Sequence, residues 1–315
     1  MDKEPHVVVI GASNLDIKGK SFKTVVPYTS NPGQVEISAG GVGRNIAENL
    51  ARLGINTTLI SAVANDPFSD FLINETRNAG VDMDHVINVE DISSSLFLAV
   101  LNHRGDLMSA ISDMAILNSI TPDKLKERET VIRTADYIIV DADIPADSMD
   151  FILNISKETG IPVCVEPVSV DKARNLLPFL DRISIVTPNR EEAEALGCME
   201  IKGGAKGVIA VGDAILEKGV KSVIITLGAE GIYFASQETK RFISSISTVV
   251  EDSVGAGDSL VAGTVFGLCR GNSMYDAIRM GIAVATLTLT TKKAVHPALT
   301  PEILEDIMAR GMTPE

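Results

Sequence analysis

The feature of this sequence that most constrains its fold is the regular alternation of short apolar runs with segments of helical period. Most of the runs are uninterrupted, as is typical of strands covered on both faces of a parallel sheet. Between the first two, apolar residues recur at helical spacing over Val42–Leu53, and Gly54 follows as a stop. We therefore predict an α/β fold, a doubly wound, mainly parallel central sheet with helices on both faces. The expected strands are His6–Ile10, Thr57–Val63, Tyr137–Val140, Ile161–Val165, Ile183–Val186, Ser222–Thr226 and Gly231–Ala235.

Two segments depart from this alternation. Residues 17–38 are polar and punctuated by glycine and proline, and residues 92–112 contain two strand-like runs, Ser95–Leu101 and Leu107–Ile111, joined by a turn. Because neither suits a crossover helix, we expect both to leave the main sheet and pair into a small second sheet. Such a sheet could serve as a lid over a site. We find no internal repeat and no long linker, so we expect one domain over residues 1–315, with lid segments 17–38 and 92–112.

Charge and composition exclude several classes of protein. The chain carries 42 acidic against 28 basic side chains, a net charge of −14, and it has no basic stripe that could follow a nucleic-acid backbone. No stretch approaches the 18 or so uninterrupted apolar residues of a membrane span. The start of the chain lacks the layout of a signal peptide, and three scattered cysteines suit a reducing compartment. We expect a cytoplasmic protein without a nucleic-acid or membrane partner.

The sequence lacks the common motifs of phosphate-binding loops, hydrolase nucleophiles and metal sites. Gly19-Lys20-Ser21 resembles the end of a P-loop, but the upstream glycine is replaced by Asn14. The dinucleotide pattern G-x-G-x-x-G is broken by Ile46 after one glycine pair and by Leu260 after another. There is no G-x-S-x-G elbow, and the four histidines have no metal-ligand spacing.

The segment Gly255-Ala256-Gly257-Asp258, followed by an apolar helix to Cys269, carries the strongest chemical signal. Small residues let the backbone turn sharply and present successive N–H groups at a helix start, which favours an anion. Asp258 would then lie beside a bound phosphate, where its carboxylate could accept a proton from an attacking hydroxyl. Taken alone, an aspartate at this position is more often an ordinary acidic residue that stabilises a helix start.

Two further clusters suit a polyol. Asn14-Leu15-Asp16 follows the first strand, and the two oxygens of Asp16 can bind vicinal hydroxyls. The run Gly40-Gly41-Val42-Gly43-Arg44-Asn45 precedes a helix and makes a second loop of close approach, where Asn45 can bind a hydroxyl.

Two more clusters suit a nucleotide and its metal. Asn189 and Glu192 lie three apart at a helix start, share one face, and could hold a hydrated Mg²⁺. The glycine turn from Thr226 to Gly231 could let a phosphate or ribose approach.

These five clusters occur together, in one order, from about residue 6 to about residue 300. In this combination the chain resembles the ribokinase-like (phosphofructokinase B) family of sugar and nucleoside kinases. Within the family, three segments are most similar to the pseudouridine kinases, namely Ser30–Gly33, Gly41–Ala47 and Ser112-Asp113-Met114.

The resemblance implies ATP-dependent transfer of a phosphoryl group to a primary hydroxyl, here the 5′-hydroxyl of a nucleoside. Asp258 would be the general base, and the N–H groups of Gly255, Ala256 and Gly257 would stabilise the migrating phosphoryl group. The expected acceptor contacts are Asn14, Asp16, Ser30, Asn31, Gly40, Gly41, Gly43, Asn45 and Asp143. The expected ATP contacts are Asn189, Thr226, Gly228 and Gly231.

The resemblance also implies metals and a partner. Glu192 and Glu166, the latter where relatives commonly carry aspartate, would serve Mg²⁺. Asp252 and carbonyls of the loop at about 288–296 match a monovalent-cation site of several relatives, which implies K⁺. In many relatives the lid pairs with a second subunit, so a homodimer is expected.

Three alternatives remain open at this point. The chain could be a kinase of the same family that acts on ribose, fructose or adenosine, or a non-catalytic nucleotide or sugar sensor on the same fold. A dinucleotide oxidoreductase is the most distant, because its fingerprint is missing. A sensor has no need of a base, so Asp258 with its full glycine turn argues against that class.

Overall fold

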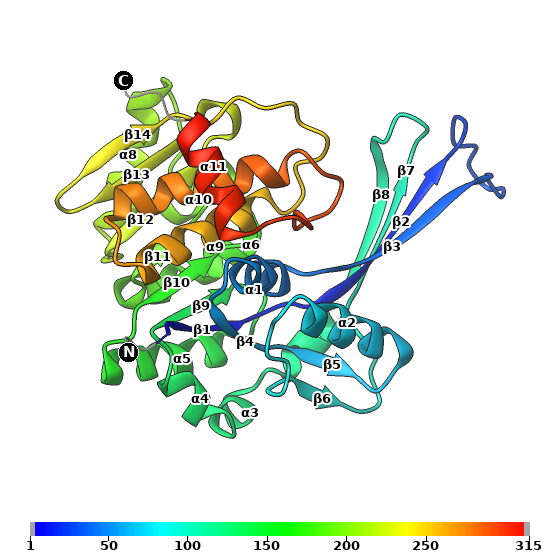
Figure 1. Ribbon diagram of the computed structural model, residues 1–315, viewed down its shortest axis with the longest axis horizontal. Helices are drawn as coiled ribbons and strands as arrows, with labels where there is room; N and C mark the ends of the chain where they lie inside the picture. The colour runs from blue at the N-terminus through cyan, green and yellow to red at the C-terminus, as the bar shows by residue number, and fades with distance from the viewer. Residues whose placement is uncertain (1–3, 312–315) are drawn as a thin grey trace.

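The computed structural model describes residues 4–311, and residues 1–3 and 312–315 lie outside the description. Its central sheet has eight strands in the order β14-β13-β12-β11-β10-β9-β1-β4 (Figure 1). The six strands from β12 to β4 run parallel, while β13 and β14 are added antiparallel at one edge. The predicted α/β class is confirmed. The strands are β1 (His6–Ile10), β4 (Asn56–Ile60), β9 (Tyr137–Asp141), β10 (Val163–Glu166), β11 (Ile185–Val186), β12 (Ser222–Thr226), β13 (Ile232–Ser236) and β14 (Lys240–Ile243).

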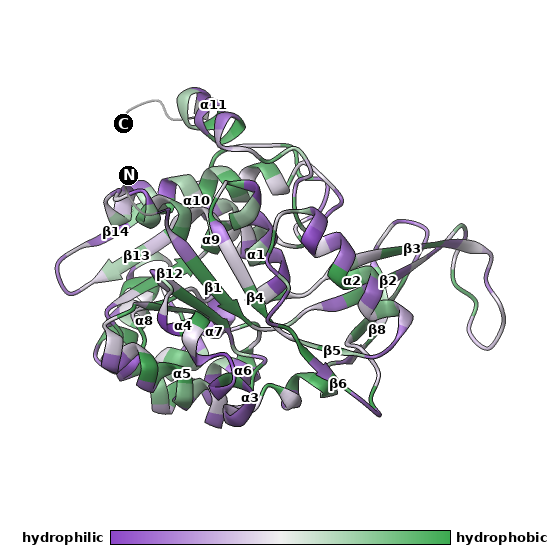
Figure 2. Ribbon diagram, turned by 60° about the horizontal axis from the view of Figure 1, so that its bottom comes forward, coloured by the Kyte–Doolittle hydropathy of each residue, from purple (hydrophilic) through white to green (hydrophobic). Residues whose placement is uncertain are grey.

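Alternate side chains of the strands enter two separate cores. In β1, Val7 and Val9 pack with one buried cluster, and Val8 and Ile10 pack with the other. The first core lies under α1 (Val42–Arg52), α9 (Ala256–Cys269), α10 (Met274–Thr288) and α11 (Pro301–Gly311). The second lies under α5 (Ala146–Thr159), α7 (Arg190–Gly197) and α8 (Ala205–Leu216). The two helix layers enclose the sheet in Figure 2.

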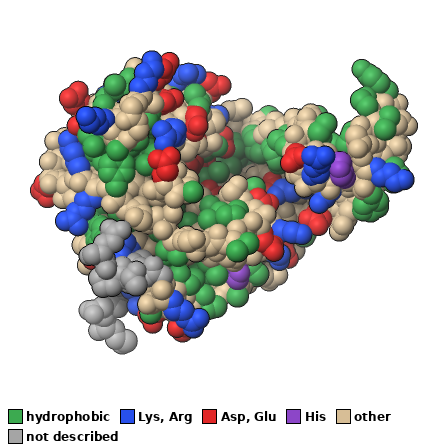
Figure 3. Space-filling view, turned by 90° about the horizontal axis from the view of Figure 1, so that it is seen from above, with side chains coloured by type: hydrophobic (Ala, Val, Ile, Leu, Met, Phe, Trp, Pro, Cys, Tyr) green, Lys and Arg blue, Asp and Glu red, His purple; other side chains and the backbone are tan. Residues whose placement is uncertain are grey.

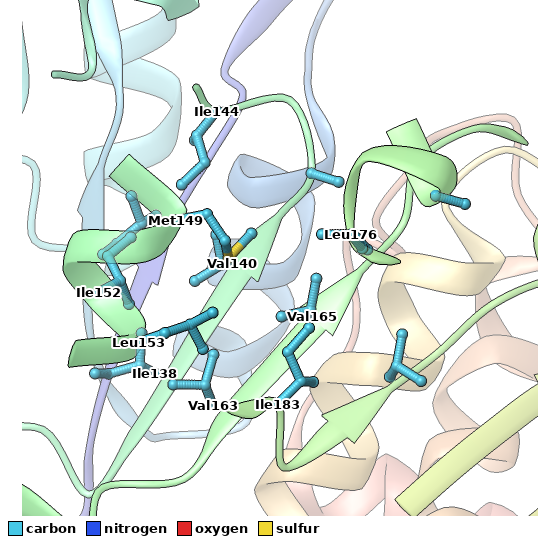
Figure 4. Packing of buried hydrophobic residues seen from close by; sticks show 14 of the residues in the cluster. Ile138, Val140, Ile144, Met149, Ile152, Leu153, Val163, Val165, Leu176 and Ile183 are labelled. Atoms are coloured by element: carbon cyan, nitrogen blue, oxygen red, sulfur yellow. The ribbon is translucent and has the colours of Figure 1, made fainter. Parts of the chain in front are cut away.

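In the second core, helix α5 packs its apolar side chains against those of strand β9. In Figure 4, Met149, Ile152 and Leu153 of α5 point toward Ile138 and Val140 of β9. All five side chains are almost fully buried. The remaining helices are α2 (Pro67–Asn78), α3 (Pro122–Lys126), α4 (Glu129–Arg133) and α6 (Val170–Asn175), with 3₁₀ turns at Ala115–Ser119, Leu177–Arg182 and Gly228–Glu230.

The two segments that depart from the alternation form a second sheet, as expected. It has the order β3-β2-β7-β8, from β2 (Asn14–Ser21), β3 (Gly33–Gly40), β7 (Leu96–Leu101) and β8 (Leu107–Asp113). This sheet, called the arm below, projects away from the main body (Figure 1). It begins at Asn14, three residues before the expected segment.

The expected single strand Thr57–Val63 is wrong. The chain leaves the central sheet after Ile60, and β5 (Ala62–Ala64) pairs with β6 (Ile87–Val89) in a two-stranded sheet. The carbonyl of Ser61 accepts the N–H of Ile87, so the break is held by a backbone hydrogen bond to a distant segment.

The edge strand β14 is not predicted by the sequence analysis, because its Lys-Arg-Phe-Ile sequence lacks an apolar run.

Among residues 4–311, no helix has the length and apolar character needed to cross a bilayer.

A substitution in the second core tests this packing. Ile152 is fully buried, so Ile152→Ala should lower the free energy of unfolding by about 2–5 kcal/mol in urea titrations. Ile209, which is 36% exposed on α8, provides the matched control, and Ile209→Ala should cost less than about 1 kcal/mol. Equal losses for the two variants would contradict the packing described.

Candidate active site

A cavity of about 820 Å³ lies at the carboxyl edge of the central sheet, where α/β proteins bind ligands. The chain passes from β1 to β4 on one side and later to β9 on the other, so the loops after β1 and β9 diverge there. The base of the arm and the start of α9 also contribute to the cavity. Its lining includes Asn14, Asp16, Lys18, Gly41, Asn45, Phe97, Ser112, Met114, Asp143, Glu166, Lys172, Asn189, Glu192, Ser253, Gly255 and Asp258.

A second cavity of about 560 Å³ adjoins the first. Glu166, Asn189, Glu192 and Ser253 line both, so they mark the boundary between the two. Thr226, Gly228 and Gly257 line only the second cavity of this pair. The first turn of α9 thus lies between two adjoining spaces, each wide enough for a small molecule.

The start of α9 requires glycine at position 255. Gly255 caps the helix with a φ of 78°, and a Cβ there would overlap the carbonyl of Ala294. At Gly257, no atom outside its own helix turn lies within 4 Å of the place a Cβ would take, so this turn is open toward the second cavity. The N–H of Ala256 donates to the carbonyl of Ser253 at 3.3 Å, which makes it the more engaged of these amides.

Asp258 lies in the first turn of α9 and is 8% exposed. Its Oδ2 accepts a hydrogen bond from Nδ2 of Asn45, on α1, at 2.8 Å. Burial raises the pKa of Asp258 to about 7, against the hydrogen bond from Asn45 and the charge of Arg44, which lower it. A carboxyl with a pKa near neutrality, facing a cavity, is suited to exchange a proton with a ligand.

Asp16 approaches the same cavity from the arm. Its Oδ1 accepts a hydrogen bond from Nδ2 of Asn14 at 2.6 Å, and burial raises its pKa. Gly41 faces it from the N-cap of α1, with a φ of 102°. A Cβ at Gly41 would lie 2.5 Å from the carbonyl oxygen of Ala12, so only glycine lets this loop reach the end of β1. Gly40 is paired with Asn14 in the β2–β3 ladder.

Asn189 and Glu192 first serve the local structure. They form a capping box on α7, in which Oδ1 of Asn189 accepts the N–H of Glu192 and Oε2 of Glu192 accepts the N–H of Asn189, both at 2.9 Å. In addition to capping the helix, both residues line the boundary between the two cavities. Burial raises the pKa of Glu192, and burial together with the charges of Glu192 and Asp258 raises that of Glu166.

Several of the predicted residues do not line either cavity. Ser30 and Asn31 lie in the loop between β2 and β3, where Asn31 makes hydrogen bonds to both backbone groups of Val26. Gly231 packs against the backbone of Ile243. Asp252 accepts the N–H of Val254 at 3.1 Å. Gly40 at the end of β3, Gly43 in the first turn of α1 and Ala256 at the start of α9 do not line either cavity, although each adjoins a residue that does.

The roles of several charged residues of the site were missed from the sequence, among them Asp141, Lys172 and Lys18. Asp141 is fully buried at the end of β9 and accepts the N–H groups of Ala12 at 2.6 Å, Gly43 at 2.9 Å and Asp143 at 3.1 Å. It ties the loops after β1 and β9 to the first turn of α1, although its burial and the charge of Asp143 raise its pKa to about 7. Lys172 of α6 lines the cavity and pairs with Asp143 at 3.4 Å.

The strand register of the arm brings Phe97 beside the predicted Asp16. Ser38, Asp16, Phe97 and Ser112 are cross-strand partners in one row, and three of the four line the cavity. Alternation in β7 could have placed Phe97 on one face, but its register with Asp16 follows from tertiary pairing alone.

The chain matches the family described as pfkB family carbohydrate kinase over residues 4–301. It is 32% identical over 300 residues to a pseudouridine kinase of Escherichia coli K12, a match covering 95% of each chain. It is 27% identical over 353 residues to a pseudouridine kinase of Arabidopsis thaliana, covering 92% of each.

Among solved structures, the fold is similar to that of an Arabidopsis thaliana ribokinase complexed with ribose and ATP. The TM-score is 0.85 at 24% identity, with 97% of this chain and 98% of that chain covered. This likeness supports the ribokinase-like fold.

The burial of Asp258 predicts a pH-dependent cost in stability. Because its pKa is raised, the folded state favours the protonated carboxyl, and the stability this group contributes is lost as the pH rises through about 7. Asp258→Asn removes that loss, so the variant should gain stability over the wild type by about 2 kcal/mol between about pH 5.5 and pH 8.5. Urea titrations at the two pH values measure it.

Asp123→Asn removes a carboxylate from the exposed start of α3 and controls for the change in net charge. A difference between Asp258→Asn and the wild type that does not grow with pH would contradict the burial of an ionisable Asp258.

Proposed function

The chain belongs to the pfkB family of carbohydrate kinases, and we propose that it phosphorylates the 5′-hydroxyl of a nucleoside, pseudouridine, with ATP. Membership makes it a ribokinase-like sugar or nucleoside kinase, a phosphotransferase with an alcohol group as acceptor. The observation that carries the finer proposal is the pair of adjoining cavities with Asp258 beside their boundary. Both pseudouridine kinases named above align with nearly the whole chain.

The larger cavity would hold the acceptor. Asp16, the backbone at Gly41, and Asn45 would bind the ribose hydroxyls, with Asn14 orienting Asp16 through their hydrogen bond. Gly40 and Gly43 would shape the loop, and Asp143 would add a polar contact beside Lys172. This arrangement would direct the 5′-hydroxyl toward Asp258.

Asp258 would act as the general base. Its carboxylate accepts the hydroxyl proton while the 5′-oxygen forms a bond to the γ-phosphorus of ATP. The bond from that phosphorus to the bridging oxygen breaks, and ADP leaves with the electron pair. A pKa near 7 keeps a useful fraction of the base ionised while leaving it basic enough to take the proton.

The turn of Gly255, Ala256 and Gly257 would stabilise the charge on the migrating phosphoryl group. Gly257 is open toward the second cavity, and Gly255 lines the first, so the turn borders both substrates. The helix dipole of α9 adds to this effect, because the 14-residue helix points its N-terminus at the boundary.

The second cavity would hold ATP, with Asn189, Thr226 and Gly228 as contacts and Gly231 shaping the turn. Glu166 and Glu192 would repel a triphosphate here, so the donor set fits a cation between carboxylates and phosphates. Within residues 4–311 no cluster of three or more His, Cys, Asp or Glu is arranged to hold a metal, so these two glutamates do not form a closed cage. They would hold Mg²⁺ through its water shell, and the ion would neutralise phosphate charge.

A K⁺ ion near Asp252 is part of the proposal. The N–H of neighbouring Glu251 donates to the carbonyl of Leu289 at 2.8 Å, which brings the 288–296 loop beside this segment. The same loop touches Gly255 through Ala294. A cation there would lie near the Gly255–Gly257 turn and would add positive charge close to the phosphate that this turn binds.

The arm would act as a lid that reads the base. Phe97 offers an aromatic face and Ser112 a hydroxyl to a planar base in the cavity. The uracil of pseudouridine carries an N–H that an N-linked uridine lacks, and a polar group that binds it would select between them. Ser30 and Asn31 would reach the base only if the arm closes.

The outer face of the arm would pair with a second copy of the chain. Ile37, Ile17, Leu98 and Ile111 form one cross-strand row on the face opposite the cavity, and Val35 and Val100 extend it. Ile37 and Ile111 are 56% and 67% exposed, an unusual exposure for a continuous apolar surface. Hydrophobic side chains also reach the surface at the far end of the projecting arm in Figure 3. We propose a homodimer, in the cytoplasm, where ATP is supplied.

The kinase proposal is tested by incubating the protein with Mg-ATP and a panel of pseudouridine, uridine, adenosine, ribose and fructose, and following ADP release. Pseudouridine should be preferred by kcat/KM, and EDTA should abolish turnover. Preference for another acceptor would keep the kinase and reject pseudouridine. No turnover with any of them would favour the sensor.

The role of Asp258 is tested with Asp258→Asn. Because a general base typically contributes about 10²- to 10⁴-fold, kcat should fall by at least the lower of these factors. Nucleoside affinity, measured by calorimetry, should change little, since the ribose contacts remain. An unchanged kcat would remove the catalytic assignment.

The dimer is tested with Ile111→Glu, which places a charge in the apolar row. Analytical ultracentrifugation should show a dimer for the wild type and a monomer for the variant. Ala110→Glu, next along the strand and on the opposite face, is the matched control and should stay dimeric. A wild type that sediments as a monomer would contradict the pairing.

A further inference from the structure

A buried chain of hydrogen bonds leads from Arg44 through Asn45 to Asp258. We propose that Arg44 is a positioning residue, which fixes the orientation of the Asn45 amide and thereby holds the Asp258 carboxylate ready to accept the proton of the acceptor. This inference deepens the proposed function and rests on it.

The guanidinium of Arg44 is set rigidly in the first turn of α1. Arg44 is 6% exposed, and its Nη1 donates to Oδ1 of Asn45 at 2.8 Å and to the carbonyl of Ala39 at 3.2 Å. Its Nη2 forms an ion pair with Glu48, one turn further along the helix. The other oxygen of Glu48 accepts from Nε of Arg52 at 2.7 Å. Arg44 is therefore held by three partners at once.

This arrangement decides which way the Asn45 amide faces. A guanidinium can only donate, so the oxygen of the amide must point to Arg44. The nitrogen then points to Asp258 and donates to its Oδ2 at 2.8 Å. One oxygen of Asp258 is thus engaged by the protein, and Oδ1 remains for a hydroxyl in the cavity. With the amide reversed, two oxygens would face each other, and the hydrogen bond that favours the ionised carboxylate would be lost.

Arg44 also acts on Asp258 through its charge. Several charged groups face this pair from the elements packed around it. Asp258 faces Arg44 from α1, Asp16 from the arm and Glu166 from β10. Arg44 faces Glu48 and Arg52 on its own helix, Asp16, and Glu75 of α2. Arg44 is the cation among the groups that act on Asp258, so removing it raises the pKa of the base, and removing its partner Glu48 lowers that pKa.

A lysine at position 44 could not orient the Asn45 amide in the same way. Its ammonium is a single point of charge, whereas the rigid planar fork of arginine donates to Asn45 and Ala39 through one nitrogen and pairs with Glu48 through another. Arg44→Lys would keep the charge and lose the orientation, while Arg44→Gln would lose both.

The test is the pH dependence of kcat, measured with Mg-ATP and the best acceptor of the panel. In Arg44→Gln, the acid limb of the profile should move up by about one pH unit, and kcat at pH 7 should fall about fivefold or more. In Arg44→Lys, which keeps the charge but releases the Asn45 amide, the limb should move up by less than in Arg44→Gln, while the pH-independent kcat falls. Arg52→Gln, which removes a positive charge from the same helix and the same glutamate without touching Asn45, should leave both nearly unchanged.

Glu48→Gln gives an opposite sign and covers the case in which Arg44→Gln does not fold. It leaves the charge of Arg44 less compensated, so the acid limb should move down. A limb that stays in place in Arg44→Gln, or that moves the same way in Arg44→Gln and Glu48→Gln, would overturn the inference. A wild type without kinase activity would instead reject the proposed function, and the two failures are therefore distinguishable.

Discussion

The site depends on one interaction, the hydrogen bond from Nδ2 of Asn45 to the buried carboxylate of Asp258. It joins the first turn of α1 to the first turn of α9, two helices that are 213 residues apart at this contact. Gly41 and Gly255 open these two turns, each with a positive φ and with no room for a side chain. The helix starts, the cavity and the orientation of the base all follow from this meeting of two glycine turns.

Burying ionised carboxylates at this site costs electrostatic free energy. Burial raises the pKa values of Asp16, Asp141, Glu166, Glu192 and Asp258, all of them at the carboxyl edge of the sheet. Each carboxylate accepts a local hydrogen bond: Asp141 from three backbone N–H groups, Glu166 from the N–H of Val168, Glu192 from the N–H of Asn189, Asp16 from Asn14 and Asp258 from Asn45. A protein that needed only stability would replace such groups by apolar ones. Their concentration beside two cavities is typical of a functional site, where buried ionisable groups exchange protons with ligands or hold cations.

Much of the fold can be predicted from the sequence, because strands buried in a parallel sheet consist of continuous apolar runs. The glycine turn before Asp258 and the cluster at Asn14 and Asp16 could also be located, since small residues and polar strand ends are local signals. The break at Ser61 and the roles of Asp141, Lys172 and Arg44 could not, because each depends on a partner distant in sequence or on strand register. Ser30 and Asn31 show the opposite limit, since similarity within the family marked them while the structure places them in a loop away from the cavities.

The central claim is that Asp258 takes a proton from a hydroxyl held at the boundary of the two cavities. The most direct measurement is a crystal structure of the complex with pseudouridine and a non-hydrolysable ATP analogue. The account predicts the 5′-oxygen at about 2.6–3.2 Å from Oδ1 of Asp258, with the terminal phosphate against the N–H of Gly257. A nucleoside bound with its 5′-hydroxyl turned away from Asp258, or a terminal phosphate distant from the start of α9, would contradict it.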